Sequence, residues 1–214
     1  MDMAVDFDFI VIIFKIVQFL LLGVFSFYIS GFRKKALMVP IVGREFTIVL
    51  KLCYIIPVFV YAYILISVEK IFATDLLAMA LSIIGTALVM RARKDLKLFH
   101  TWAGYCRLEA KLVTTGIYAY IRHPIYAGVY FFIFGGLTTI APHLVFGGII
   151  AAFPALPLVV QLFAIGSLIY GMGFIVFVAS RESRILQKAL GEEYARYREQ
   201  IHAFLPLRKF KPGK

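Results

Sequence analysis

Five long apolar runs are the feature that most constrains how this chain can fold. A bilayer with a hydrocarbon core of about 30 Å is crossed by roughly 20 predominantly apolar residues in an α-helix. The runs cover residues 9–28, 46–68, 76–90, 124–140 and 158–178. The chain is 62% hydrophobic and 16% charged, whereas a soluble domain is about 45–50% apolar and about 25% charged. The sequence therefore predicts an all-α integral membrane protein with about five transmembrane helices.

The Lys and Arg residues are concentrated in three of the segments that flank these runs. Residues 33–51, residues 91–122 and the segment from Arg181 onward are basic, whereas the N-terminus is acidic and the connections 69–75 and 141–157 are nearly neutral. Because basic segments remain in the cytoplasm, this pattern predicts an N-terminus outside and three basic regions inside. Such an arrangement needs an odd number of crossings, so we expect five. Residues 141–157 then form either a re-entrant segment or part of a helix.

The net charge of +11 has the same explanation. In a membrane protein, Lys and Arg accumulate in cytoplasmic loops that face anionic lipid. We therefore expect membrane lipids as partners and no nucleic acid. The four histidines, at positions 100, 123, 143 and 202, show no spacing typical of a metal site, so no metal is expected.

The longest hydrophilic segment ends in a stretch rich in chemically capable groups. Gly116 precedes the triplet Arg122-His123-Pro124, and proline suits the first position of a helix. The free N–H groups and the positive dipole end of that helix predict an anion site, to which Arg122 adds a fixed charge that can hold a carboxylate. On the residues alone, an interpretation as a membrane-topology signal with an interfacial aromatic belt stands equally open. Three tyrosines supply rings and hydroxyls nearby, at Tyr118, Tyr120 and Tyr126.

Two motifs connect this stretch to a known family. From Leu112 to Tyr126, the pattern Leu-Val-x-x-Gly-x-Tyr-x-x-x-Arg-His-Pro-x-Tyr resembles the signature of the isoprenylcysteine carboxyl methyltransferase family. That family belongs to a broader group of membrane methyltransferases, which includes phospholipid N-methyltransferases. The C-terminal part is similar as well, with Arg181-Glu182 followed by Leu-Gly-Glu-Glu-Tyr-x-x-Tyr and a final Phe-Leu-Pro. The resemblance covers roughly residues 94–206.

The resemblance implies an enzyme that uses S-adenosylmethionine as methyl donor. The cofactor pocket would be enclosed by the cytoplasmic loop and the C-terminal helix, and a lipid-like acceptor would enter from the bilayer. Residues 1–92 would hold the first three helices and residues 93–214 the catalytic region. The implied catalytic residues are Glu182, Arg122 and His123. The implied cofactor-binding residues are Lys111, Val113, Gly116, Tyr118, His123, Pro124, Tyr126 and Glu182.

The acceptor and two rival interpretations stay open. The family usually has paired glutamates where this chain has Glu182-Ser183, and often an arginine where it has Ala203. The acceptor is therefore either the carboxylate of a prenylated cysteine or a phospholipid amine. Membrane sterol reductases carry a related Arg-His-Pro-x-Tyr and use NADPH, whose 2′-phosphate the basic residues of segment 91–111 could bind. The third interpretation is a non-enzymatic membrane scaffold. The oligomeric state is also open.

Overall fold

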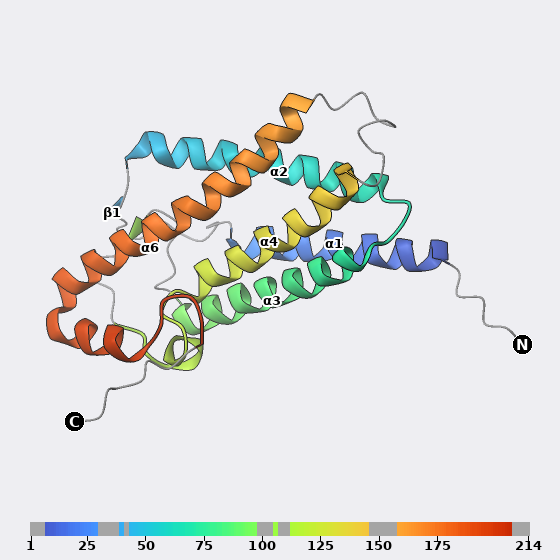
Figure 1. Ribbon diagram of the computed structural model, residues 1–214. Coiled ribbons are helices and arrows are strands. Elements are labelled where there is room, and N and C mark those ends of the chain that lie inside the picture. Colours follow the sequence, from blue (N-terminus) through green and yellow to red (C-terminus); the bar gives the residue numbers. More distant parts are fainter. Residues whose placement is uncertain are drawn as a thin grey trace, which may run out of the picture.

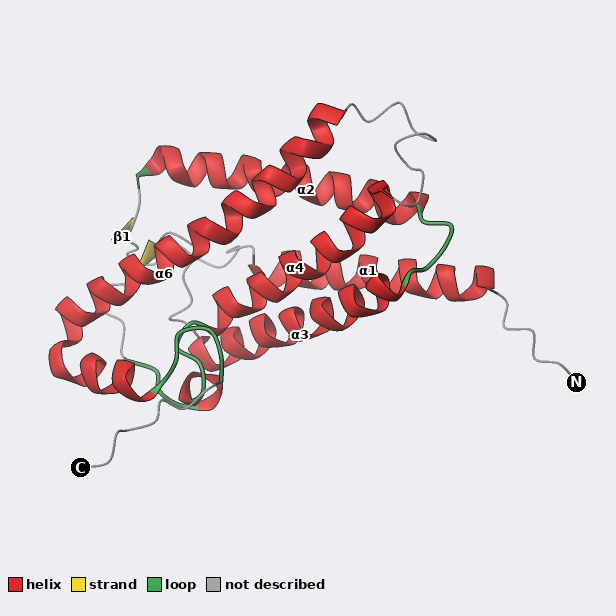
Figure 2. Ribbon diagram, viewed as in Figure 1, coloured by secondary structure: helices red, strands yellow, loops and turns green. Residues whose placement is uncertain are grey.

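A computed structural model describes residues 7–29, 39–40, 43–97, 105–106, 112–145 and 158–206. It confirms the all-α fold class (Figures 1 and 2). Two strands of two residues each accompany the helices, β1 (Val39–Pro40) and β2 (Tyr105–Cys106). The helices are α1 (Phe7–Ile29), α2 (Arg44–Ser67), α3 (Ala73–Leu96), the short 3-10 helix η2 (Gly116–Ala119), α4 (Pro124–Val145) and α6 (Leu158–Gln200).

The described helices have the length and composition of a membrane protein. Three of them contain candidate membrane spans, within Phe9–Ile29, Ala73–Leu96 and Leu162–Gln200. The other two long helices contain shorter apolar segments, Pro57–Ser67 in α2 and Pro124–Ile140 in α4. Because the backbone must satisfy its own hydrogen bonds in lipid, apolar runs of this kind fold as helices. The protein is thus an integral membrane protein.

The long helices run back and forth between two ends of the molecule (Figure 1). One end carries the starts of α1 and α3. The other carries η2 and the last part of α6. There β1 pairs with β2 in antiparallel fashion, with Val39 opposite Cys106, which brings the basic segments 33–51 and 91–122 to the same end. This agrees with the grouping that the charge pattern predicted. The side of the membrane on which this end lies stays a prediction.

Helices α3 and α4 approach each other closely through glycines. A Cβ atom added to Gly85 would lie 2.6 Å from the carbonyl oxygen of Gly128, and one added to Gly128 would lie 2.6 Å from that of Gly85. One turn after Gly128, Phe132 of α4 stacks on Phe25 of α1 with ring centroids 3.8 Å apart. Small residues permit such close packing in lipid, where van der Waals contact drives helix association. This contact fixes the start of α4, and with it the Arg122-His123-Pro124 triplet.

The sequence predicts a membrane span that ends near residue 178 and a separate charged helix after it. Helix α6 does not show this separation. The helix runs without a break past residue 178 into the charged residues, and non-helical backbone angles at Gly191 separate it from a last helical stretch that ends at Gln200. Nine of the 20 residues from 181 to 200 are charged, so the apolar, membrane-spanning part ends before Arg181. We call residues 181–200 the charged part of α6. Gly191 has a φ of +54°, which glycine adopts readily, and the chain turns there.

The structure answers two sequence predictions on the organisation of the chain only in part or not at all. The division into residues 1–92 and 93–214 falls inside α3 and stays a prediction. The uncertain segment 141–157 begins as helix, because α4 continues through Pro142 to Val145. Its remaining residues, 146–157, lie outside the described part of the chain.

Candidate functional site

The C-terminal residues 201–204 lie against the residues that precede α4. The backbone N–H of Arg122 donates to the carbonyl of His202 at 2.9 Å, and that of His123 donates to the carbonyl of Ala203 at 2.8 Å. Ile121 and His202 form a parallel bridge. The N–H groups that immediately precede α4 are therefore satisfied within the chain. Any anion site at this helix start would have to use the N–H groups of its first turn.

Arg122 ties this junction together. Its Nε donates to the carbonyl of Ile201 at 2.9 Å. Its Nη1 is buried and has no hydrogen-bond partner among the described residues. Because leaving a buried donor on a charged group unsatisfied costs at least about 1–3 kcal/mol, Nη1 marks a place where an acceptor from a ligand would be stabilising.

His123, Tyr126 and Glu182 form one cluster. His123 Nδ1 lies 3.8 Å from Glu182 Oε2, and His123 Nε2 lies 3.0 Å from Ser183 Oγ. The Tyr126 hydroxyl donates to the Glu182 carboxyl. The rings of His123 and Tyr126 stack with centroids 5.6 Å apart. The start of α4 supplies the imidazole and the phenol, and the charged part of α6 supplies the carboxyl and the hydroxyl.

Burial controls the charges in this cluster. The His123 side chain is 6% exposed, and its burial, reinforced by the charge of Arg122, lowers its pKa to about 3. Burial raises the pKa of Glu182 to about 7, against the opposing effect of the Tyr126 hydrogen bond. The imidazole is therefore neutral at physiological pH, and the His123–Glu182 contact is not an ion pair. Near neutral pH, the carboxyl exists in both protonation states.

Tyr118 joins η2 to the same cluster. Its side chain is buried, and burial, followed by the charge of Glu182, raises the pKa of its phenol. Its backbone carbonyl accepts a 2.6 Å hydrogen bond from the Tyr197 hydroxyl. The charged part of α6 therefore holds η2 in place on one side.

Asp95 of α3 holds η2 on the other side. Its Oδ2 accepts the Ile117 N–H at 2.8 Å and the Arg91 Nε at 3.2 Å. Gly116 has a φ of +63°, and a Cβ atom there would lie 2.2 Å from Asp95 Oδ2. Only glycine fits this position, because both the backbone angle and the contact exclude a side chain.

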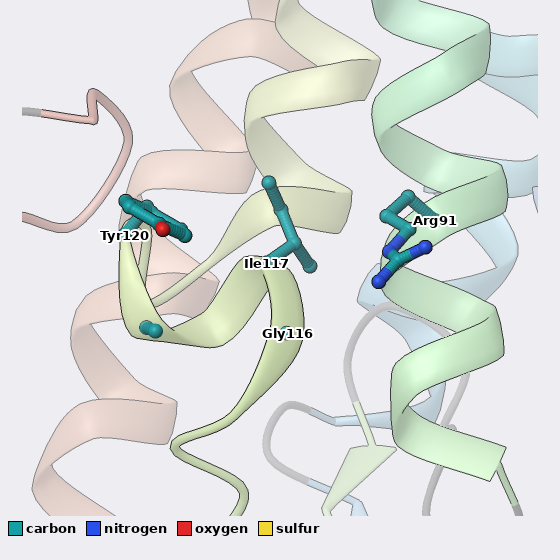
Figure 3. A pocket seen from close by; sticks show the side chains of 5 residues that line it. Arg91, Gly116, Ile117 and Tyr120 are labelled. Carbon is teal, nitrogen blue, oxygen red and sulfur yellow. The ribbon is translucent and has the colours of Figure 1, made fainter.

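A cavity of about 410 Å³ opens between η2 and α3. Figure 3 shows Arg91 of α3 on one side of Ile117 and Tyr120 on the other. We call this the outer cavity, and the residues that line it are Arg91, Gly116, Ile117, Ala119 and Tyr120. Tyr118 and Ile121, which do not line it, are buried, whereas Tyr120 is 56% exposed.

The sequence-predicted residues are thus partly brought together. His123, Tyr126 and Glu182 meet, the charge of Glu182 acts on the phenol of the buried Tyr118, and Pro124 is buried at the start of α4. Gly116 lines the outer cavity, and Val113 is half-buried ahead of η2. Lys111 lies outside the described residues. Within the described ranges, no group of three or more His, Cys, Asp or Glu residues is placed to hold a metal ion.

Sequence reasoning missed three residues that shape this site: Asp95, Ser183 and Tyr197. Tyr197 carried a signal, because it falls in the apolar spacing of the charged part of α6. Ser183 stands where the family that the sequence resembles usually has a second glutamate. The sequence therefore indicated only the loss of a carboxylate at this position. Asp95 carried no signal, since its role depends on the packing of α3 beside η2.

The fold and the site together define a class of protein: an all-α integral membrane protein with a carboxyl–imidazole–phenol cluster where α4 meets the charged part of α6. Residues 73–165 match the family model described as phospholipid methyltransferase. This match agrees with the resemblance to the isoprenylcysteine and phospholipid methyltransferase group that the sequence predicts. The matched segment contains α3, η2 and the Arg122-His123-Pro124 triplet, while Glu182 lies beyond it. A comparison with curated proteins finds no match.

Proposed function

We propose that this protein is an S-adenosylmethionine-dependent methyltransferase that acts on a lipid-like acceptor at the cytoplasmic face of the membrane. The observation that carries the proposal is the cluster of His123, Tyr126 and Glu182. It joins the start of α4, inside the methyltransferase family match, to the charged part of α6. The carboxyl lies just past the apolar part of that helix, at the height where a lipid head group would meet water.

The residues around the cluster fit the chemical groups of the donor. S-adenosylmethionine, when bound, supplies a methyl group on a positively charged sulfur. The Glu182 carboxylate complements a cationic ligand and can accept hydrogen bonds from an amino or ribose hydroxyl group. The buried Nη1 of Arg122 fits an amino-acid carboxylate. We propose the predicted residues Lys111, Val113, Gly116, Tyr118 and Pro124 as further contacts to the donor.

The chain's own contribution to catalysis would be orientation and exclusion of water. Holding two reactants in line can lower a barrier by about 7–11 kcal/mol. A carboxylate acceptor needs no base, because it is already ionised. An amine acceptor has to lose a proton, and the Glu182 carboxylate can take it, since its pKa is raised by burial to about 7. The neutral imidazole of His123 orients that carboxyl and also offers an unprotonated nitrogen.

The acceptor class that we propose is a lipid carrying either an amine or a carboxylate. The family description names phospholipids, which favours an amine on a head group. The chain's departures at Ser183 and Ala203 leave fewer charged groups for reading a prenylcysteine carboxylate. Assays should therefore begin with aminophospholipids and then test prenylated cysteine analogues.

The first experiment is calorimetric titration of the detergent-purified protein with S-adenosylhomocysteine and, in parallel, with NADPH. We expect S-adenosylhomocysteine to bind, and Glu182→Ala and His123→Ala to abolish the binding. Glu193→Ala is the matched control, because Glu193 is exposed on the same charged part of α6, and this variant should bind normally. Binding of NADPH in place of S-adenosylhomocysteine would overturn the proposal in favour of a reductase.

A further inference from the structure

The lipid-facing side of α3 ends in basic residues. Ile83, Ile84 and Met90 are exposed large apolar residues on this helix. Arg91 and Lys94 continue the exposed surface over the last turns, at the end of the molecule where η2 lies. An apolar stripe that passes into cations at the membrane boundary matches the layout of a phospholipid, with acyl chains along the stripe and the phosphate beside the cations.

The outer cavity lies at this boundary. It is open to the surroundings and lined by Arg91 from α3 and by Gly116, Ile117 and Tyr120 from η2 and the residue after it (Figure 3). Tyr120 is 56% exposed, and an exposed tyrosine at this height is typical of the head-group region. The cavity thus combines a cation, an aromatic ring and an apolar side chain within about 410 Å³.

The guanidinium of Arg91 pairs with the carboxylate of Asp95 one turn further along α3. Its Nε donates to Asp95 Oδ2 at 3.2 Å, and the Arg91 side chain is 57% exposed whereas that of Asp95 is 14% exposed. Asp95 therefore lies behind Arg91 and directs the remaining guanidinium donors outward. Because Asp95 also holds the Ile117 N–H at 2.8 Å, one carboxylate positions both walls of the cavity.

The cavity is separate from the His123–Glu182 cluster. None of the residues that line the cavity belongs to this cluster, and Tyr118, which lies between two of them in η2, is buried. A ligand in the cavity would therefore touch the outer face of η2 without reaching Glu182.

We propose that this cavity binds the phosphate head group of an anionic phospholipid that is not consumed in the reaction. Arg91 would donate charge-assisted hydrogen bonds to the phosphate, Lys94 would add attraction, and the acyl chains would lie along Ile84 and Met90. The two acyl chains of the lipid hold its head group at the cavity. A free phosphate ion has no such chains and would not be held in this way. The site goes beyond the proposed methyl transfer and does not depend on it.

The first test measures lipid binding by native mass spectrometry of the detergent-purified full chain. Phosphatidylglycerol is the probe, and phosphatidylcholine with the same acyl chains is the zwitterionic reference. Arg91→Gln should weaken phosphatidylglycerol binding about tenfold, the usual scale for losing a charged hydrogen bond, and leave phosphatidylcholine unchanged. Lys188→Gln removes the same charge from an exposed position on the charged part of α6 and should have little effect. Equal losses in both variants would overturn the proposal in favour of general charge attraction.

The second test uses the unaltered protein in lipid nanodiscs. A photoactivatable phosphatidylglycerol with its reactive group near the head group should label the peptides that contain Arg91 and Tyr120. Excess unlabelled phosphatidylglycerol should suppress this labelling, whereas the same concentration of inorganic phosphate should not. Labelling elsewhere only, or suppression by inorganic phosphate alone, would refute a lipid site. Failure of S-adenosylhomocysteine to bind would contradict the proposed function but leave this result intact.

Discussion

The hydroxyl of Tyr197 donates a 2.6 Å hydrogen bond to the backbone carbonyl of Tyr118, a residue 79 positions earlier in the chain. Both side chains are buried. This bond connects the charged part of α6 to η2, and the turn at Gly191 allows Tyr197 to reach it. The hydrogen bond thereby joins η2 and the charged part of α6, the two elements on either side of the candidate site. It involves neither His123 nor Glu182.

Replacing Tyr197 by phenylalanine removes this bond and leaves the Tyr118 carbonyl without its partner. We expect Tyr197→Phe to lose about 1–3 kcal/mol of stability and to bind S-adenosylhomocysteine several-fold more weakly. Melting in detergent and calorimetry measure the two effects. Tyr170→Phe is the control, because Tyr170 is 40% exposed on the apolar part of α6. Unchanged affinity in Tyr197→Phe would show that the bond does not position the site.

The raised pKa of Glu182, about 7, predicts pH-dependent donor binding. The charged carboxylate is the form that best accepts hydrogen bonds from the ammonium and ribose hydroxyl groups of the ligand, and it predominates only above that pH. Affinity for S-adenosylhomocysteine should therefore increase as the pH rises from 5.5 to about 7 and then level off. His123, with a pKa of about 3, stays neutral throughout this range. Glu182→Gln should give a flat profile, and a pH dependence that persists in this variant would assign the titration to another group.

The same shift predicts how stability depends on pH. Because the folded-state pKa of Glu182 lies above its ordinary value of 4.5, folding favours the protonated carboxyl. Its contribution to stability should decrease as the pH rises from about 4.5 to 7 and stay constant above that. Glu182→Gln mimics the protonated form, so its melting temperature relative to the wild type should increase over this interval. A constant difference between the two proteins would contradict the shift.

Asp95 is expected to act on the site through η2. Asp95→Ala removes the acceptor of the Ile117 N–H, which should weaken S-adenosylhomocysteine binding several-fold. Asp95→Asn keeps an amide oxygen that can accept the same bond, so it should restore most of the affinity. Calorimetry of both variants checks this order. Equal losses in the two variants would indicate that the charge of Asp95, and not the hydrogen bond, is what matters.

The close contact between α3 and α4 predicts a steric effect. A Cβ atom at Gly128 would lie 2.6 Å from the carbonyl oxygen of Gly85 and 2.7 Å from a side-chain atom of Val89. Gly128→Ala should therefore push the helices apart and cost about 1–3 kcal/mol of stability. Gly166→Ala on α6 meets nothing within 4 Å and should be neutral or slightly stabilising. Melting of both variants in detergent makes the comparison, and equal melting temperatures would contradict the packing.

The sequence by itself determined the membrane helices and the resemblance to a methyltransferase family. Lipid offers no hydrogen bonds to the backbone, so each apolar run must satisfy its own groups as a helix, and hydropathy can be read segment by segment. The Arg122-His123-Pro124 triplet and Glu182 were likewise recognisable, because each belongs to a short local motif. The expected break between the last membrane helix and the charged helix was less accurate, since the charged residues from Arg181 onward continue the same helix and the chain turns only at Gly191.

Only the tertiary structure decided how these motifs are connected. The contact of His123 with Glu182 and Ser183, the bond of Tyr197 to the Tyr118 carbonyl and the position of Asp95 behind η2 each join residues from different helices. Their distances depend on how closely α3 packs on α4 and on where α6 turns. Those features arise from the fit of many side chains at once, which no local pattern encodes. The sequence therefore identified most of the side chains of the candidate site. The packing of the helices determined which of these side chains come into contact and which charges they carry.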